Sequence, residues 1–497
     1  MHFALALHIS ALSGELAWGQ SLPNVQRFLP WGIEVSQEID STLKLPGKSL
    51  FAETAHLNGS QSGGWNGKAF AWPLSAQFRA YNSLTRYNPA VYTPILTAFA
   101  DDFHSAYWSS SGGYFCCSGG GDRFYDDNAH LAVALAEAYE VTGDHTHLDR
   151  AIATYDFLLT GEAPGANGGS YWSVADHSFL DTTAALQGAR AALMIYKATG
   201  DSAYLENAHL RYNWARETTQ LSGGTFLEKL YLTGPKAGQV GDYDLIHYAG
   251  YAIAANTLFY DVTGEQSYLT EAQRIASASL PRYFNASTGR IGDEGYWAYE
   301  LVDGLVDLYR RDGNPLWLSK VSGAMQWLHD NKKDPEGHYG LFWGRGGAQL
   351  GVLESWDLNN QAPVARAFLH TALVQATPLA PIHNADFNGD AAVDGADFLT
   401  WQRGMGVTRQ PSRAAGNADG DDAVDAADLA IWRNQFGIVS PSAVSAEIPE
   451  PSSAALMLAA IALRVCRVRR RLQSSRRAHV PRRSRPRAIR SLVSPPP

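Results

Sequence analysis

A turn motif that recurs along the first two thirds of the chain constrains the fold more than any other feature. Each copy has a Tyr four residues before a Gly, then an acidic or amide residue, and then an aromatic residue or His followed by Leu. The four glycines are Gly143, Gly200, Gly264 and Gly313. A stretch with helical periodicity precedes each glycine, which can end that helix in the left-handed conformation. The polar residue after the glycine can cap the next helix, so the motif predicts repeated helical hairpins.

The spacing of the motif indicates an all-α repeat architecture. Intervals of 49 to 64 residues separate the glycines, a period typical of stacked helical pairs. Five hairpins fit between Trp72 and Asn331, and the first helix with the last one, 361–376, makes a sixth. Six hairpins predict a closed (α/α)6 barrel, with an open solenoid as the alternative. Long Gly- and Trp-rich connections at 165–173 and 337–347 favour the barrel, which builds its binding cleft from such loops.

A second, shorter repeat follows the helical region. Residues 386–406 align without a gap to 417–437 at a period of 31 residues, and Trp401 matches Trp432. Oxygen-bearing side chains recur at loop positions 1, 3, 5, 9 and 12, the spacing that wraps oxygen ligands around Ca²⁺. The predicted ligands are Asp386, Asn388, Asp390, Asp394 and Asp397 in the first loop and Asn417, Asp419, Asp421, Asp425 and Asp428 in the second. The sequence therefore predicts a small structural calcium module and no cofactor for catalysis.

Composition divides the rest of the chain into segments. The expected segments are a weak export signal over 1–20, a barrel domain over 21–377, a linker over 378–383, the calcium module over 384–438, a linker over 439–453, a short apolar run with arginines over 454–471, and a disordered basic tail over 472–497. The N-terminal segment fits an ordinary first helix equally well, because it lacks a basic start. The apolar run 454–463 is too short for a bilayer span, which needs about 20 residues.

The charge distribution excludes one class of partner. The net charge of −9 becomes −21 when the 12 arginines from Arg464 onward are removed. An acidic body is a poor match for nucleic acid. The three cysteines include two neighbours, Cys116 and Cys117, and are too few for a disulfide framework. We expect a monomer.

One pair of carboxylates stands out as a candidate catalytic site. Asp126 and Asp127 lie next to each other where a helical stretch begins. One of them can serve simply as a helix cap, and the pattern alone does not separate this role from catalysis. A retaining glycosidase needs two carboxyls about 5–5.5 Å apart, one as nucleophile and one as acid and base. Neighbouring residues at the junction of a loop and a helix can reach that separation.

Residues near this pair and in later loops are candidates for sugar contacts. Flat aromatic faces stack on sugar rings, although packing in the core is their commoner role. The candidates are Trp65, Trp72, Tyr125, Tyr171, Trp172, Asp244, Tyr248 and Trp343.

Residues 60–375 resemble glycoside hydrolase family 76, the (α/α)6-barrel endo-α-1,6-mannanases. The shared order is Tyr-Asp-Asp at 125–127, a Thr-Gly-Asp turn at 142–144, Gly-Gly-x-x-Trp-Ser at 168–173, and further turns at 199–201 and 263–265. The resemblance implies hydrolysis of an α-mannan-type polysaccharide, with Asp126 as nucleophile and Asp127 as acid and base. Two departures concern substrate contacts. Asn-Ala-His-Leu follows the Asp pair where family members carry Trp, and His-Tyr-Ala-Gly replaces Tyr-Asn-Gln-Gly at 247–250.

Two further resemblances concern the C-terminal part. The duplicated loops resemble a type I dockerin, which implies a cohesin-like or surface-bound partner. The order of Pro449-Glu450-Pro451, apolar run and arginines resembles the PEP-CTERM sorting signal of exported bacterial proteins. Together they imply a secreted or cell-surface enzyme.

Two other functions remain open at this stage. A sugar epimerase or isomerase on a similar barrel would use His as proton carrier, with His130 and His247 as candidates. A barrel that binds glycans without catalysis would need neither aspartate.

Overall fold

The computed structural model describes residues 24–344, 351–375, 385–388, 392–408, 413–418 and 423–437. The predicted export signal and the Arg-rich tail lie outside these residues, as does the linker 378–383. Among the residues described, no helix is long and apolar enough to cross a membrane.

The described part of residues 24–375 contains twelve α-helices joined as hairpins. The helices are α1 (Phe28–Thr42), α2 (Ala71–Tyr87), α3 (Pro89–Tyr107), α4 (Tyr125–Thr142), α5 (His145–Leu159), α6 (Thr182–Thr199), α7 (Ser202–Thr218), α8 (Ile246–Thr263), α9 (Gln266–Tyr283), α10 (Gly295–Asp312), α11 (Pro315–Lys332) and α12 (Leu358–Ala372). Short 3₁₀ helices at Val25–Arg27 and Leu373–Gln375 flank them.

The repeated turn motif forms the tight link within four of these hairpins, as predicted. Gly143, which ends α4, has a φ of 70°, and its backbone N–H bonds to the carbonyl of Tyr139. Asp144 follows, and its side chain accepts a hydrogen bond from the N–H of Thr146 at the start of α5. The same left-handed glycine ends α6, α8 and α10. Only glycine takes this conformation without strain, which is why the motif repeats.

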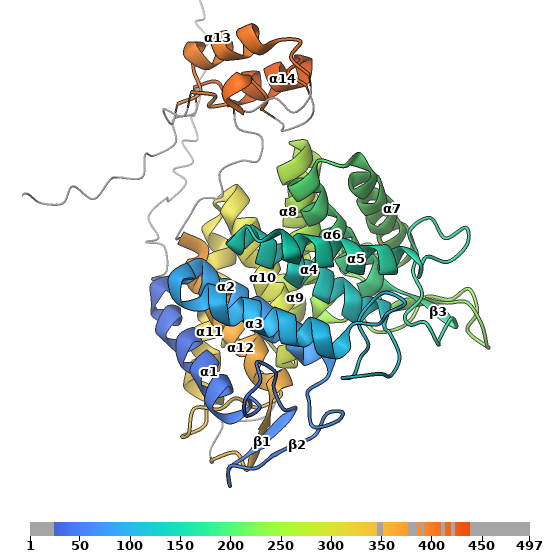
Figure 1. Cartoon of the computed structure of the whole chain (residues 1–497), viewed down its shortest axis with the longest axis vertical. Coiled ribbons are helices and arrows are strands. Elements are labelled where there is room, and N and C mark those ends of the chain that lie inside the picture. The colour runs from blue at the N-terminus through green and yellow to red at the C-terminus, as the bar shows by residue number, and fades with distance from the viewer. Residues whose placement is uncertain are drawn as a thin grey trace, which may run out of the picture. The chain divides into compact units, whose positions relative to one another are not determined.

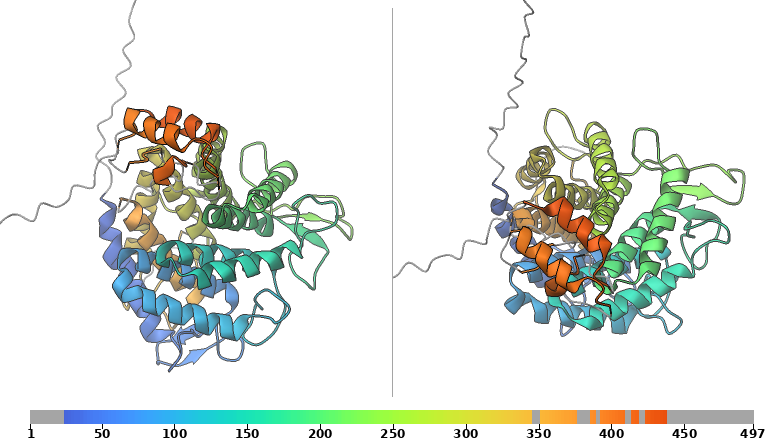
Figure 2. Two further views of the ribbon diagram at one scale, coloured as in Figure 1. Left: turned by 45° about the horizontal axis from the view of Figure 1, so that its top comes forward. Right: turned by 90° about the horizontal axis from the view of Figure 1, so that it is seen from above.

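The even-numbered helices form a closed inner ring. Each of α2, α4, α6, α8 and α10 packs against the next, and α12 packs against both α10 and α2. The odd-numbered helices lie outside, and α1 pairs with α12 (Figure 1). Figure 2 shows the same helices from two further directions. The fold is therefore the predicted (α/α)6 barrel and not an open solenoid.

All the long connections lead into the N-terminal ends of the inner helices. They carry short strands at β1 (Thr54–His56), β2 (Gln61–Ser62), β3 (Phe179–Asp181), β4 (Lys229–Tyr231) and β5 (Ser355–Asp357). β1 pairs antiparallel with β2 and with β5, which joins the first loop to the last, and β3 pairs with β4. One end of the ring thus carries the loops, and the other carries the tight turns.

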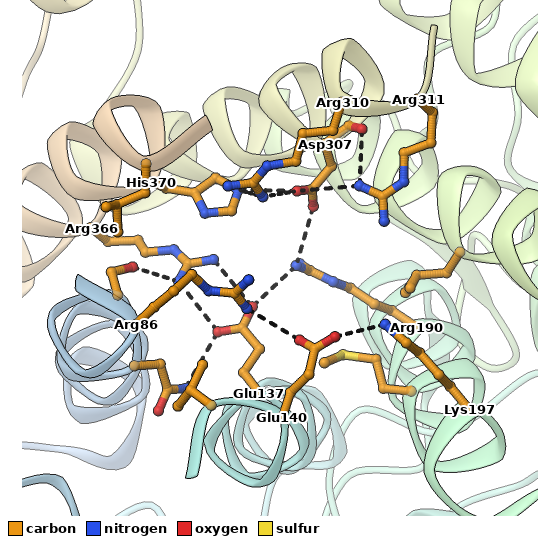
Figure 3. Close-up of a pocket in the computed structure, with 16 residues that line it drawn as sticks. Arg86, Glu137, Glu140, Arg190, Lys197, Asp307, Arg310, Arg311, Arg366 and His370 are labelled. Atoms are coloured by element: carbon orange, nitrogen blue, oxygen red, sulfur yellow. Dashed lines mark hydrogen bonds and ion pairs between the residues drawn. The ribbon is translucent and has the colours of Figure 1, made fainter. Parts of the chain in front are cut away.

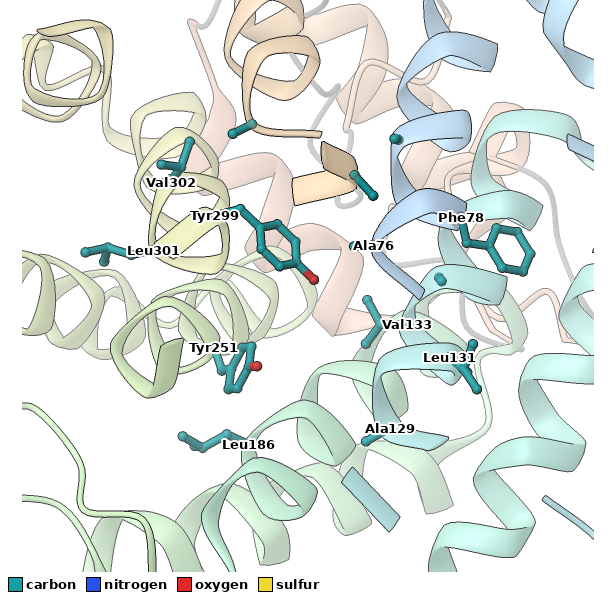
Figure 4. Close-up of a cluster of buried hydrophobic side chains, with 14 of the residues drawn as sticks. Ala76, Phe78, Ala129, Leu131, Val133, Leu186, Tyr251, Tyr299, Leu301 and Val302 are labelled. Atoms are coloured by element: carbon teal, nitrogen blue, oxygen red, sulfur yellow. The ribbon is translucent and has the colours of Figure 1, made fainter. Parts of the chain in front are cut away.

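Small residues let the inner helices approach closely. A Cβ placed on Gly304 of α10 would lie 2.7 Å from the carbonyl oxygen of Gly250 in α8, so both positions require glycine. Buried apolar side chains fill the layer between inner and outer helices. Figure 4 shows part of this core, with Tyr251 and Tyr299 directed toward the interior of the ring.

The axis of the barrel is filled by a buried network of charges. Arg79 of α2 contacts Glu137 of α4 at 3.0 Å, Glu300 of α10 at 2.9 Å and Asp303 at 2.6 Å. Arg366 of α12 contacts Glu137 at 3.1 Å and Asp303 at 2.9 Å. These arginines, with Arg190, hold the pKa of Glu137 well below its ordinary value despite its burial.

The network continues into a small polar cavity at the turn end of the ring. Glu137, Arg190 and Arg366 line it together with residues near the C-terminal ends of the inner helices (Figure 3). The other charged residues there are Arg86, Glu140, Lys197, Asp307, Arg310, Arg311 and His370. Basic side chains at this end are favourable, because the C-termini of helices carry the negative ends of the helix dipoles.

The second repeat forms a small helical unit. It contains α13 (Gly395–Gly404), the 3₁₀ helix Arg413–Ala415 and α14 (Ala426–Gln435). Two matching hydrogen bonds join the halves of this unit. The indole of Trp401 donates to the carbonyl of Asp425 at 2.7 Å, and the indole of Trp432 donates to the carbonyl of Asp394 at 2.9 Å. The unit has its own core, in which Phe387, Trp401 and Val424 are buried.

We expect Arg79→Met to lower the free energy of unfolding by about 3–5 kcal/mol, because it removes the cation that three buried carboxylates share. Urea unfolding followed by circular dichroism measures the change. Arg274→Met removes an exposed pair with Glu271 and should cost about 0–1 kcal/mol. Equal effects of the two changes would contradict a structural role for the buried network.

Candidate active site

The two adjacent carboxylates lie at the loop end of the inner ring. Asp126 and Asp127 occupy the first turn of α4, and their residues are 7% and 9% exposed. The loops hold this turn, because the N–H of Tyr125 bonds to the carbonyl of Trp172 at 2.7 Å. The N-terminus of α4 stabilises negative charge at this position.

The two carboxylates have different surroundings. Asp126 Oδ2 accepts a hydrogen bond from the indole Nε1 of Trp172 at 3.0 Å, and Asp126 Oδ1 accepts one from the backbone N–H of Asp127 at 2.9 Å. Burial raises the pKa of Asp126 to about 6, while these donors and His130 oppose the rise. Burial and the neighbouring charge of Asp126 raise the pKa of Asp127 well above its ordinary value. Asp126 is therefore the carboxyl that ionises more readily.

A third buried carboxyl, which the sequence analysis missed, belongs to the same cluster. Asp181 lies at the end of β3 and caps α6, where Oδ1 accepts from the N–H of Ala184 at 2.8 Å. Burial, followed by the charge of Asp126, raises its pKa well above the ordinary value. The available signal was its position immediately before an inner helix, but there it looks like an ordinary helix cap.

Two buried histidines belong to the inner helices, His130 to α4 and His247 to the first turn of α8. His130 follows Asp126 by one helical turn, and its ring contacts Gln187 at 3.2 Å and the hydroxyl of Tyr251 at 3.0 Å. Burial and, to a smaller extent, the nearby His130 lower the pKa of His247 to about 3. Both side chains are 2% exposed.

Three of the predicted aromatic contacts lie around the carboxylates. Trp172 binds Asp126 directly, as described above. Trp72, at the start of α2, stacks on His130 with ring centroids 5.7 Å apart. Tyr248, in the first turn of α8, is buried, and the charges of Asp181 and Asp126 help to raise its pKa. These side chains form a half-buried wall around the acid cluster.

The other predicted contacts have different surroundings. Tyr125 is buried and stacks on Phe157, 4.9 Å away, between α4 and α5. Tyr171 stacks on His177 in its own loop. Asp244 bonds to Thr225 at 2.8 Å and to Arg282 at 2.7 Å. Helix periodicity does not reveal these side-chain directions, because they depend on how the loops fold.

The remaining two tryptophans are at opposite extremes of burial. Trp343 is 1% exposed, and its indole covers Gly295 at the start of α10. Trp65 is 52% exposed on a tight turn between two glycines. Of these two tryptophans, Trp65 is the one whose side chain is open to solvent.

The predicted calcium ligands are described in part. Asp390, Asp419 and Asp421 lie outside the described residues. Asp397 is fully buried and accepts from the N–H groups of Phe387 and Asp394, at 2.7 and 2.9 Å. Asp428 makes the matching bonds in the second loop. Asp394 and Asp425 cap the two helices. Among the residues described, no group of three or more His, Cys, Asp or Glu side chains could hold a metal ion.

We expect Asp127→Asn to raise the melting temperature at pH 7. The raised pKa of Asp127 means that the folded protein binds this proton more tightly than the unfolded chain does. The associated stability is complete below the ordinary carboxyl pKa and is lost as pH rises through the raised value. An amide avoids that loss, so the gain should be a few degrees at pH 7 and should shrink at pH 4. Thermal unfolding at both pH values tests this, with exposed Asp149→Asn as control; a variant that melts lower than the wild type at pH 7 would contradict the burial penalty.

Comparisons with known proteins agree with this geometry. An α-mannanase of family 76 from Bacteroides thetaiotaomicron matches with a TM-score of 0.63 and 24% identity, over 69% of this chain and 95% of that one. An inactive α-1,6-mannanase variant from Salegentibacter sp., with two adjacent aspartates changed to asparagine and α-1,6-mannotriose bound, matches with a TM-score of 0.59 and 17% identity, over 70% and 100%. A D-mannose isomerase matches with a TM-score of 0.57 and 14% identity, over 71% and 99%.

These likenesses show the shared barrel fold, and a search of curated protein sequences gave no match. The family assignment rests on a family model. The model of glycosyl hydrolase family 76 matches residues 49–297, half of the chain, including the carboxylate pair and the inner helices α2, α4, α6 and α8. The chain is therefore a glycoside hydrolase that belongs to glycosyl hydrolase family 76.

Proposed function

We propose that this protein is a retaining glycoside hydrolase that cleaves internal glycosidic bonds of an α-1,6-mannan-type polysaccharide. The observation that carries the proposal is the pair of adjacent buried carboxyls at the loop end of the barrel, which have unequal pKa values. The solved α-1,6-mannanase variant supports the choice of substrate, because changing two adjacent aspartates to asparagine made that enzyme inactive and the variant carries α-1,6-mannotriose.

The surroundings of the two carboxyls suit two different roles. Asp126, which accepts two hydrogen bonds, is the more readily ionised and would attack the anomeric carbon to form a covalent glycosyl-enzyme. Asp127, whose pKa is raised further, would protonate the leaving oxygen and then take a proton from the attacking water. Environments that push two neighbouring pKa values apart are how one site obtains both an acid and a base.

The alternatives make different demands on the same residues. An isomerase would use His130 or His247, but both are buried, and the ring of His130 contacts Gln187 and Tyr251. A barrel that only binds glycans would retain its function without either aspartate. Incubating the full chain with α-1,6-mannan and other α-glycans, followed by product analysis, separates cleavage from isomerisation and from binding alone.

Asp126→Asn and Asp127→Asn should each lower kcat on α-1,6-mannan by at least about 10³-fold, because each removes one of two essential steps. Both variants should keep the circular dichroism spectrum of the wild type. Asp149→Asn, an exposed change elsewhere on the barrel, should leave kcat unaltered. Turnover close to wild type in either site variant would refute the assignment.

The pH profile tests the two roles separately. We expect kcat/KM to rise as pH passes the Asp126 pKa of about 6 and to fall where Asp127 loses its proton at higher pH. Trp172→Phe removes the N–H that stabilises ionised Asp126, so the acid limb should move to higher pH. Trp31→Phe, on an indole that stacks on His329 in the outer layer, is the matched control. An acid limb that stays in place in Trp172→Phe would show that Asp126 does not govern it.

We further propose that the enzyme is exported and that its C-terminal unit binds Ca²⁺. The matched Asp397 and Asp428, each buried and bonded to its own loop backbone, support a duplicated structural site. The partner of this C-terminal unit would be a cohesin-like or surface-bound protein. Calorimetric titration of the metal-free chain with Ca²⁺ should show two sites, and Asp397→Ala with Asp428→Ala should abolish them. No heat of binding would overturn this proposal without affecting the barrel.

A further inference from the structure

The loop that leads into α4 holds two cysteines whose sulfur atoms touch. The Sγ atoms of Cys116 and Cys117 lie 2.6 Å apart. This distance is shorter than the van der Waals contact between two sulfur atoms that are not bonded. Cys117 is 6% exposed, whereas Cys116 is partly exposed. The backbone thus holds two thiols against each other at the loop end of the barrel.

The surrounding loop is shaped around this pair. Gly121 has a φ of 98°, and a Cβ there would lie 2.7 Å from Sγ of Cys116 and 3.2 Å from Sγ of Cys117. The loop also closes on itself, because the N–H of Cys116 bonds to the carbonyl of Asp122 and the N–H of Gly120 bonds to that of Cys117. Any side chain at Gly121 would displace the sulfurs.

The pair is hydrogen-bonded to the start of the inner helix α2. The carbonyl of Cys116 accepts a hydrogen bond from the N–H of Ala71, the first residue of α2, at 2.9 Å. Burial raises the pKa of Cys117 to about 12, with further contributions from Cys116 and from the charge of Asp127. Cys117 therefore lies within the electrostatic reach of the carboxylate pair, and Cys116 is the thiol that solvent can reach.

We propose that Cys116 and Cys117 join in a disulfide bond that fixes the loop between α2 and the carboxylate pair of α4. The oxidant is a small disulfide or a dithiol oxidase of the exporting compartment. Cys116, as thiolate, attacks one sulfur of the oxidant and releases a thiolate. Cys117 then attacks the sulfur of Cys116 and releases the second thiolate. Each released thiolate takes one proton, so two cysteine thiols and one disulfide become one cysteine disulfide and two thiols.

The bond has a local effect and little effect on global stability. A ring closed by neighbouring residues removes almost no entropy from the unfolded chain, so stabilisation by this route is small. The bond instead restricts the loop backbone that positions the starts of α2 and α4. It also leaves neutral sulfur, with no ionisable thiol, beside Asp127.

Mass spectrometry of the full chain tests the bond directly. After treatment with oxidised glutathione, iodoacetamide should leave both Cys116 and Cys117 unmodified, and the peptide that contains them should be two hydrogen masses lighter than its reduced form. Cys466→Ser should give the same peptide, which separates a bond between neighbours from one to the third cysteine. Alkylation of Cys116 after this treatment, or its linkage to Cys466, would overturn the proposal.

Hydrogen exchange tests the role of the bond. Reduction should accelerate exchange several-fold in peptides covering 113–124 and leave peptides from α9 unaltered. Cys116→Ser with Cys117→Ser should exchange at the reduced rate under both conditions. Equal exchange in oxidised and reduced wild type would show that the bond does not fix the loop. These readouts hold whatever glycan the enzyme cleaves.

Discussion

The rest of the barrel depends on the buried ion pairs that Arg79 makes at the centre of the ring. This arginine binds carboxylates from α4 and α10, and Arg366 of α12 binds two of the same carboxylates. A buried network of this kind adds little net stability compared with an apolar core, but it strongly penalises a missing partner. Helices that are far apart in the sequence must therefore pack in the one arrangement that pairs the charges of the network.

The parallel direction of the inner helices gives the barrel two chemically different ends. Their N-termini meet the long loops, where Asp126, Asp127 and Asp181 gather, and their C-termini meet the tight turns, where basic residues line the small cavity. Helix dipoles favour this arrangement of charge. A cluster of buried carboxyls is nevertheless costly, and the raised pKa values show that the dipoles compensate only in part. In the proposed mechanism, catalysis by carboxyls of unequal acidity uses this residual cost.

Much of the fold could be predicted from the chain because its signals are local. A left-handed glycine, an Asp or Asn cap and a helical period act over a few residues, so each hairpin is visible in the sequence by itself. The pairing of α1 with α12 follows from counting, once the ring is taken as closed. The carboxylate pair was found for the same reason, since both members occupy one helical turn.

The sequence by itself determined the hairpins and the adjacent acids Asp126 and Asp127, and it favoured a closed ring over an open solenoid. Only the tertiary structure decided which distant residues share the site, because loop packing is set by contacts between segments far apart in the chain. It brought Asp181 and Trp172 to Asp126, packed Tyr125 against Phe157 between α4 and α5, and buried Trp343 over Gly295. Periodicity identifies a helical face, but the direction of a loop side chain depends on the neighbours that the fold supplies.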